Sequence, residues 1–147
     1  MQNLYPLFLQ SKGVSTDTRT LTSGQLYFAL KGPSFNGNRF AHQALKKGAL
    51  AVVVDEPIDG ADKRFVLVDD VLTSLQQLAN HHRNQLGTSI IALTGSNGKT
   101  TTKELIHAVL QSHYKVIATE GNLNNHIGVP LTLLRLQSDT EFAVVEM

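Results

Sequence analysis

The stretch TGSNGKTT at residues 94–101 combines the residue types that bind a phosphate group. Its two glycines, Gly95 and Gly98, let backbone N–H groups turn inward around an anion because they carry no Cβ. Lys99 can supply a positive charge for the β- and γ-phosphates, and the hydroxyl of Thr100 suits a magnesium ion. The loop therefore predicts a site for a nucleoside triphosphate or a similar phosphate.

Two regular elements must position this loop. The apolar run Ile90–Leu93 precedes it and predicts a buried strand. A helix is predicted from about Lys99, because apolar residues recur at helical spacing at Leu105, Ile106, Val109 and Leu110. The N-terminus of that helix would point unpaired N–H groups and a positive dipole end at the same phosphate. The common pattern G-x-x-x-x-G-K-[ST] has a glycine where this chain has Leu93, so an ordinary strand, turn and helix without a ligand is the alternative.

The rest of the sequence alternates between predicted strands and predicted helices. Further strands are predicted at Gln25–Leu30, Ala49–Val54, Phe65–Val68, Lys115–Ala118 and Phe142–Glu146. Further helices are predicted from Leu4, over Arg39–Lys47, after Asp69 or Asp70, and over Pro130–Leu136. This alternation is typical of parallel sheets with helices against their faces. The predicted fold class is therefore α/β, with a small N-terminal α/β domain over residues 1–86. It is followed over residues 87–147 by the opening strand, phosphate-loop and helix units of a truncated, parallel-sheet nucleotide-binding domain.

Three local features are predicted from turn and cap residues. Residues 31–38 are predicted to form a loop, because glycine and proline punctuate this stretch. Asn38 is predicted to cap the helix that follows it, and Phe40 is expected to be buried by that helix. Pro130 is predicted to occupy the first position of the last helix, where its missing N–H costs nothing.

The composition limits the classes of function. The chain has 147 residues and a formal net charge of +1, with 41% hydrophobic and 17% charged residues. This charge balance argues against nucleic acid as the main partner, because binding to a phosphate backbone needs clustered Lys and Arg. The chain has no cysteine, which excludes disulfides and thiolate metal sites. It shows neither a signal-peptide pattern nor an apolar run long enough to span a bilayer, so a cytoplasmic location is predicted.

Four stretches together resemble the Mur ligase family of bacterial peptidoglycan synthesis. They are Ser15–Arg19 with Gly24–Gly32, Asn36–Phe40 in place of an Asp-Gly-His-type loop with both polar positions altered, the phosphate loop TGSNGKTTTKE, and the asparagine-rich Gly121–Pro130. The family's version of the phosphate loop explains the leucine at position 93. The resemblance implies a UDP-sugar-binding domain in residues 1–86 and the first part of a central ATPase domain in residues 87–147. The last stretch favours the family member that adds the terminal dipeptide over members that add the third residue.

The resemblance also implies a reaction and a set of site residues. ATP would phosphorylate the carboxylate of UDP-N-acetylmuramoyl-tripeptide, and the amine of D-Ala-D-Ala would attack the acyl phosphate. Lys99 would be catalytic, and Mg²⁺ would be held by Thr100 and Glu146. ATP would contact Gly95, Ser96, Asn97, Gly98, Lys99, Thr100 and Thr101. The substrates would contact Ser15, Thr16, Asp17, Arg19, Lys31, Gly32, Asn36, Gly37, Asn122, Asn124 and Asn125.

Simpler interpretations stay open for several of these residues. Asp17 and Arg19 can pair with each other across a turn. Asn124 and Asn125 can be turn residues in left-handed geometry, and Glu146 can be only the polar end of a strand. The alternative functions are another Mur-type ligase, either third-residue-adding or folylpolyglutamate-like, and a non-catalytic module that binds a UDP-sugar or a nucleotide. Because about sixty residues supply too few strands for a whole nucleotide-binding domain, the chain is expected to be a fragment inactive by itself.

Overall fold

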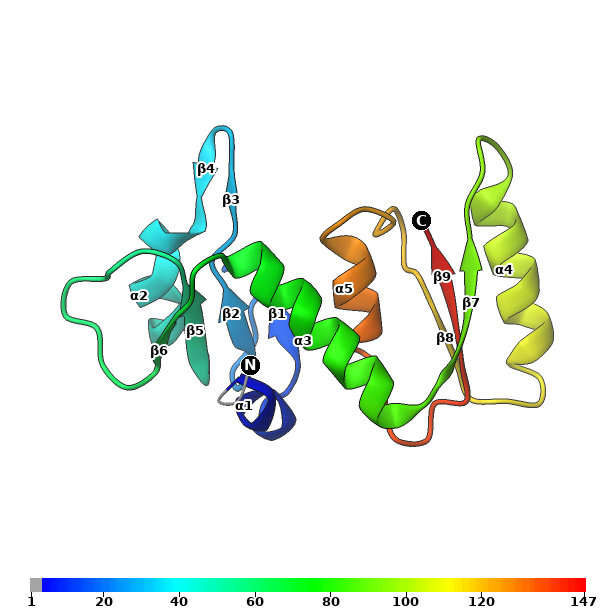
Figure 1. Ribbon diagram of the computed structural model, residues 1–147, viewed down its shortest axis with the longest axis horizontal. Coiled ribbons are helices and arrows are strands. Elements are labelled where there is room, and N and C mark those ends of the chain that lie inside the picture. Colours follow the sequence, from blue (N-terminus) through cyan, green and yellow to red (C-terminus); the bar gives the residue numbers. More distant parts are fainter. Residues whose placement is uncertain (1–3) are drawn as a thin grey trace. The chain divides into compact units, whose positions relative to one another are not determined.

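The computed structural model describes residues 4–147. The chain divides into two compact units, Met1–Gln77 and Leu78–Met147, whose elements are labelled in Figure 1. The division falls within the helix α3 (Val71–Leu86), which therefore contributes residues to both units. Each unit contains a parallel sheet, which confirms the predicted α/β class. Within residues 4–147, no helix has the length and apolar character that crossing a membrane requires.

The first unit is built on a parallel sheet with the strand order β1-β2-β5-β6. Its strands are β1 (Val14–Ser15), β2 (Leu26–Phe28), β5 (Ala51–Val54) and β6 (Phe65–Leu67). The two central strands, β2 and β5, are buried along their whole length. This is the burial expected when helices cover both faces of a sheet and its strands are continuously apolar. The helices of this unit are α1 (Leu4–Gln10), the 3-10 helix η1 (Gly37–Phe40), α2 (Ala41–Lys46) and the start of α3.

The stretch predicted as a loop after β2 contains a short antiparallel hairpin. Its strands are β3 (Lys31–Gly32) and β4 (Phe35–Asn36). The hairpin leads directly into η1, whose cap is Asn36: its side-chain oxygen accepts a hydrogen bond from the backbone N–H of Asn38 at 2.9 Å. The prediction that Asn38 is the cap is therefore wrong, because the chain enters a 3-10 turn two residues earlier. Phe40 is not buried either, since 37% of it is exposed and its ring stacks on Phe35.

The helix α3 begins where the sequence predicts. The carboxylate of Asp70 accepts a hydrogen bond from the backbone N–H of Thr73 at 2.6 Å, so Asp70 rather than Asp69 caps the helix. Three of its apolar residues, Leu75, Leu78 and Ala79, are buried. The same helix therefore supplies core residues on both sides of the division between the units.

The second unit contains a parallel sheet with the strand order β7-β9-β8. Its strands are β7 (Ser89–Leu93), β8 (Val116–Ala118) and β9 (Phe142–Glu146), and its further helices are α4 (Lys99–Leu110) and α5 (Gly128–Leu133). The strand β9 is the last in sequence but lies in the centre of this sheet, between β7 and β8. Residues 143–146 of β9 are buried, and Leu136 and the partly buried Ile90 and Ile117 pack in the same core.

The strand before the phosphate loop is less buried than predicted. In the described chain β7 is an edge strand, and all of its residues are half-buried or exposed. The apolar residues of α4 are also only partly covered, since 63% of Leu105 and 70% of Val109 are exposed. An apolar pattern shows that a strand or a helix face is able to be buried, but coverage depends on what packs against it.

The last helix begins two residues earlier than predicted. Its first helical residue is Gly128, and Pro130 occupies the third position. The first N–H groups of a helix all lack an intrahelical partner, so a proline there is tolerated as well as at the first position. Gly128 must be a glycine for a different reason, because a Cβ at this residue would lie 2.4 Å from the backbone of Leu123.

Candidate functional site

The predicted phosphate loop connects β7 to α4 through two glycines in conformations that other residues rarely adopt. The φ angle is 147° at Gly95 and 77° at Gly98, both in the region that favours glycine. Lys99 is the first residue of α4, and its ammonium group folds back over the loop to donate a hydrogen bond to the carbonyl of Gly95 at 2.7 Å. The twelve-residue α4 thus begins at the loop, as the sequence predicts for a phosphate site at a helix N-terminus.

A carboxylate from a distant part of the chain completes this site. The hydroxyl of Thr100, in the first turn of α4, lies 3.1 Å from one carboxylate oxygen of Glu146 and 3.3 Å from the other. The parallel register pairs Glu146 with Leu93, the last residue of β7. The carboxylate therefore lies at the strand ends, where the loop leaves the sheet. Ligands of open parallel sheets bind at these carboxyl ends.

The third side chain at this point is Asn124, from the connector between β8 and α5. Its amide donates a hydrogen bond to Glu146 at 3.0 Å, and only 2% of Glu146 is exposed. The pKa of the Glu146 carboxyl is lowered, chiefly by the hydrogen bond from Asn124 and against the effect of burial. The hydroxyl of Thr100 and the positive charges of Lys103 and Lys99 lower this pKa further. Glu146 therefore presents a negative carboxylate beside a hydroxyl oxygen.

These donors fit a magnesium ion. Mg²⁺ prefers hard oxygen ligands, needs only one or two carboxylates and keeps several waters. Within residues 4–147 no group of three or more His, Asp or Glu side chains is placed to hold a metal. The oxygens of Thr100 and Glu146 at the phosphate loop are hard ligands of the kind that suits this cation.

The other asparagines of the connector have different surroundings. The side-chain oxygen of Asn125 accepts hydrogen bonds from the backbone N–H groups of Ile127 at 3.0 Å and Gly128 at 2.8 Å, which holds the turn that leads into α5. Asn122 is exposed. Within residues 4–147 no residue other than glycine has a positive φ, so the interpretation of Asn124 and Asn125 as left-handed turn residues is wrong. Asn124 thus contacts Glu146 at the loop, whereas Asn125 holds the turn that leads into α5.

The predicted substrate residues Ser15, Thr16, Asp17 and Arg19 form a tight turn in the first unit. The hydroxyl of Ser15 donates to the backbone carbonyl of Asp17 at 3.0 Å. The Asp17 carboxylate accepts hydrogen bonds from the backbone N–H and the guanidinium of Arg19, the shortest at 2.6 Å. These bonds lower the pKa of Asp17 to about 2. Asp17 and Arg19 therefore pair with each other across the turn, and 87% of the Arg19 side chain remains exposed.

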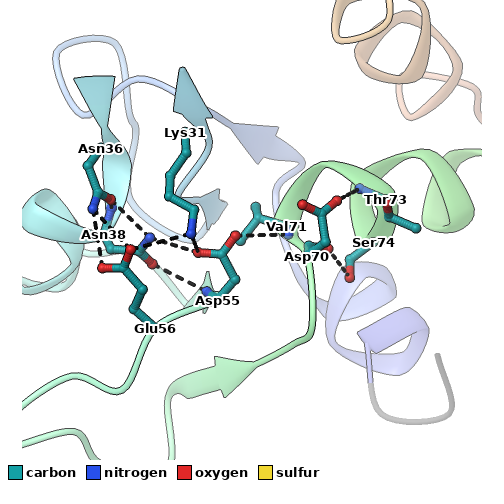
Figure 2. Close-up of polar contacts among 9 residues, drawn as sticks. All are labelled: Lys31, Asn36, Asn38, Asp55, Glu56, Asp70, Val71, Thr73 and Ser74. Atoms are coloured by element: carbon teal, nitrogen blue, oxygen red, sulfur yellow. Dashed lines mark hydrogen bonds and ion pairs between the residues drawn. The ribbon is translucent and has the colours of Figure 1, made fainter. Parts of the chain in front are cut away.

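A second polar cluster surrounds the hairpin β3–β4 (Figure 2). The ammonium group of Lys31 lies 3.0 Å from Asp55 and 3.3 Å from Glu56, and these partners raise the pKa of Lys31. The amide of Asn36 donates to both oxygens of Glu56 at 3.2 Å. Asn38 donates to the buried carboxylate of Asp55 at 2.8 Å. The hairpin is thus fastened to the residues that follow β5.

The two predicted glycines of this cluster differ. Gly32 is exposed, and a Cβ added to it would meet nothing within 4 Å. Gly37 is buried, and a Cβ there would lie 2.6 Å from the carbonyl oxygen of Leu30. The requirement for glycine at position 37 therefore comes from backbone packing.

The structure brings together only part of the predicted site. Thr100, Asn124 and Glu146 meet at one end of the sheet of the second unit, next to the loop that Lys99 binds. The Ser15–Arg19 turn and the hairpin cluster belong to the first unit. Four residues that were not predicted as site residues hold neighbouring groups in place: Asp55, Glu56, Lys103 and Thr119. Asp55 could have been found from its position directly after a buried parallel strand, where polar residues gather at the sheet edge.

The fold and the site together define an α/β protein with a phosphate-binding loop at the carboxyl ends of parallel strands. Residues 10–83 match the Mur ligase family, catalytic domain, and residues 93–147 match the Mur ligase middle domain. The first match covers half of the chain. The protein belongs to the Mur ligase family.

Individual relatives agree with this assignment. The chain is 52% identical to the UDP-N-acetylmuramoyl-tripeptide–D-alanyl-D-alanine ligase of Bacillus subtilis over 92% of its own length and 30% of that protein. It is similar to a crystal structure of MurF from Acinetobacter baumannii, with a TM-score of 0.87, 40% identity, and coverage of 93% of this chain and 30% of that one. It is also similar to the MurF ligase of Thermotoga maritima in complex with ADP, with a TM-score of 0.84, 31% identity, and coverage of 95% and 32%. The chain thus spans about 30% of the length of the curated relatives that it matches.

Proposed function

We propose that the protein is an ATP-dependent ligase of peptidoglycan precursor synthesis that joins D-Ala-D-Ala to UDP-N-acetylmuramoyl-tripeptide in the cytoplasm. The observation that carries the proposal is the meeting of Thr100 with Glu146, 46 residues later in the chain, at the mouth of a glycine-bearing loop. The relatives that carry this activity in their names, at 46–52% identity, support the choice of reaction. The ADP complex of the Thermotoga ligase supports an adenine nucleotide as a ligand of this chain.

The proposed chemistry activates the carboxylate of the tripeptide, which is by itself a poor electrophile. The carboxylate of the tripeptide attacks the γ-phosphorus of ATP, and ADP leaves with the electron pair of the broken P–O bond. The amine of the dipeptide then attacks the acyl phosphate, loses a proton and expels inorganic phosphate. Catalysis of both steps depends mainly on positioning and on stabilisation of developing charge.

The residues of the loop have distinct parts in this scheme. Lys99, released from the carbonyl of Gly95, holds the β- and γ-phosphates and offsets the charge that develops during transfer. The backbone N–H groups of residues 95–101 surround the phosphates at the positive end of α4. Thr100 and Glu146 would hold Mg²⁺, which when bound would neutralise negative charge of the phosphates. Asn124 orients the Glu146 carboxylate toward this position.

We propose that the UDP-sugar contacts residues of the first unit. Ser15, Thr16, Asp17 and Arg19 would contact the diphosphate region, because the exposed guanidinium of Arg19 is suited to a phosphate. Lys31, Gly32, Asn36 and Gly37 would lie along the sugar nucleotide. An anionic ligand would have to compete with Asp55 and Glu56 for the ammonium group of Lys31. Asn122, Asn124 and Asn125 would offer amide groups near the peptide.

The 147 residues alone are expected to bind without ligating. They span only about 30% of the relatives' length, so we propose residues 1–86 as the sugar-nucleotide domain and residues 87–147 as the first part of the ATPase domain. In isolation the chain would then act as a binding module. Dipeptide ligation by the purified 147-residue chain would contradict this.

The test is a magnesium-dependent ligation assay on the full-length ligase that contains this chain. UDP-N-acetylmuramoyl-tripeptide is offered with D-Ala-D-Ala or with a diamino acid, and phosphate release is measured. Lys99→Ala is expected to lower turnover by at least a hundredfold, because it removes the charge at the phosphates. Lys115→Ala is the matched control, since Lys115 pairs with Asp139 on an exposed surface of the same unit. Unchanged turnover in Lys99→Ala would refute the site, and turnover only with the diamino acid would favour a third-residue-adding ligase.

A further inference from the structure

Lys103 lies inside the second unit although lysine side chains rarely do. It is three residues after Thr100 on α4, and only 2% of its side chain is exposed. Its ammonium group donates a hydrogen bond to the backbone carbonyl of Thr119 at 2.7 Å and lies 2.9 Å from the carboxylate of Glu104. Removing an ammonium group from water is unfavourable unless hydrogen bonds and an opposite charge compensate for it. Neither solubility nor helix propensity explains why a lysine is buried so close to the proposed nucleotide site.

Thr119 is the first residue after β8, and all three of its polar groups bind neighbouring elements. Its backbone N–H donates to Val144 at 2.9 Å, which continues the ladder between β8 and β9. Its hydroxyl accepts a hydrogen bond from the backbone N–H of Glu146 at 3.0 Å. The Thr119 hydroxyl thus accepts a hydrogen bond that a backbone carbonyl would accept within the sheet, at the point where the chain leaves the sheet. The carbonyl of Thr119 is therefore available, and Lys103 binds it.

Thr119 influences both the backbone and the carboxylate of Glu146. The backbone of Glu146 is bound by the hydroxyl of Thr119, and its carboxylate is bound by Thr100 and Asn124. The connector that carries Asn124 starts from Thr119, five residues earlier. A shift of Thr119 would thus move the end of β9 and the start of the asparagine connector together.

We propose that Lys103 is a positioning residue of the nucleotide site, which acts through Thr119 to hold Glu146 and Asn124 in register with Thr100. The proposal rests on the proposed function, because it assigns Lys103 a part in magnesium-dependent nucleotide binding. Lys103 makes no contact with the phosphates in this scheme. Its loss should therefore weaken the contribution of the metal and leave binding of the nucleotide alone nearly unchanged. A purely structural lysine would change stability without this selective effect.

The test compares Lys103→Met with wild type in the full-length ligase, by calorimetric titration with ADP in excess Mg²⁺ and in EDTA. Methionine preserves much of the side-chain volume and removes the charge and the donors. Substitution of groups that orient metal ligands typically costs 10–100-fold in metal affinity or activity, so we expect roughly tenfold weaker binding of ADP with Mg²⁺. Binding in EDTA is expected to stay within about twofold. Glu104→Gln is the matched control, because Glu104 is 62% exposed and its loss leaves the bond to Thr119 in place.

Two further measurements separate the outcomes. Amide hydrogen exchange at Glu146 should accelerate in Lys103→Met and not in Glu104→Gln, since this amide is bound by the Thr119 hydroxyl. If Lys103→Met does not fold, Thr119→Val and Thr119→Ser replace it: valine removes the hydroxyl and should show the magnesium-selective loss, and serine should not. Equal magnesium dependence in wild type and the folded Lys103→Met, or in both Thr119 variants, would overturn the proposal. Absence of ADP binding in wild type would instead reject the proposed function.

Discussion

At the scale of single residues, the same residue type serves different purposes at neighbouring positions. Gly32 and Gly37 lie in and next to the β3–β4 hairpin, and the family resemblance implies that both are substrate contacts. Only Gly37 is required by packing, because a Cβ there would lie 2.6 Å from the Leu30 carbonyl oxygen and 2.7 Å from the Ala29 carbonyl carbon. The two positions can therefore be separated by substitution with alanine.

Gly37→Ala is expected to destabilise the protein by about 1–3 kcal/mol, the usual range for inserting a methyl group where there is no room. Gly32→Ala, whose Cβ would meet nothing within 4 Å, should stay within about 0.5 kcal/mol of wild type. Urea unfolding of both variants measures the difference. If the two variants lost equal stability, the backbone contact at position 37 would not be the cause.

The pair of Asp17 and Arg19 predicts a pH dependence. Hydrogen bonds from Arg19 lower the pKa of Asp17 from 3.8 to about 2 in the folded protein. The folded state therefore binds this proton more weakly than the unfolded state, so the pair contributes stability above the unfolded pKa, and this contribution is lost as the pH falls toward 2. The effect is expected to be small, because the pair is largely exposed to solvent.

The measurement is the free energy of unfolding of wild type and Asp17→Asn at several values between about pH 5 and about pH 2. The difference between them should shrink as the pH falls. Asp62→Asn is the comparison, because Asp62 forms the same contact with Arg64 and its pKa is also lowered to about 2. A difference that stays constant across this range would contradict the assignment of the pKa shift to the pair.

At the scale of secondary structure, the ends of elements position the functional groups. The loop begins where β7 ends, α4 begins at Lys99, and the register of β7 with β9 brings Glu146 opposite Leu93. In the first unit, Asp70 caps α3 next to Asp55, whose carboxylate also accepts the N–H of Val71 at 3.5 Å. The start of α3 and the hairpin cluster are therefore connected through one carboxylate (Figure 2).

Asp70→Ala is expected to cost about 1 kcal/mol of stability, as loss of a helix cap typically does. Its carboxylate bond to the N–H of Thr73 at 2.6 Å would be lost, and that N–H would have only water as a partner. Asp69→Ala is the control, since Asp69 carries the same charge as Asp70 and lies one residue before the cap. Thermal unfolding of the two variants gives the comparison, and an equal loss in both would argue for a general charge effect.

At the scale of the whole molecule, the chain divides into units with different degrees of coverage. The first unit buries its central strands on both faces. The second leaves an apolar surface, formed by residues of β7 and α4, that includes Ile91, Leu105, Ile106, Val109 and Leu110. Exposed apolar surfaces of this kind promote association. The division of the chain also falls nine residues before the domain boundary that we propose from the sequence, because α3 contributes to both units.

The 147-residue chain is therefore expected to self-associate as its concentration rises. Val109→Lys places a charge on the apolar surface, where 70% of the valine is exposed, and should shift the sedimentation profile toward monomer without lowering stability. Gln111→Lys adds the same charge just beyond the end of α4 and should shift it much less. Equal profiles for both variants would show that net charge, and not this surface, controls association.

The sequence by itself determined the features that depend on neighbours within a few residues. These are the alternation of strands and helices, the glycine turn before Lys99 and a helix cap at Asp69 or Asp70, of which the structure selects Asp70. It predicted that Thr100 and Glu146 act together only through the family resemblance.

Only the tertiary structure decided which residues meet. Thr100 reaches Glu146 across 46 residues, and Lys103 is buried against Thr119, because the parallel register places β9 between β7 and β8. Likewise, the partners of Lys31 are the two residues that follow β5, more than twenty residues away. Contacts of this range depend on strand order and register, which the residue pattern of a single strand does not specify.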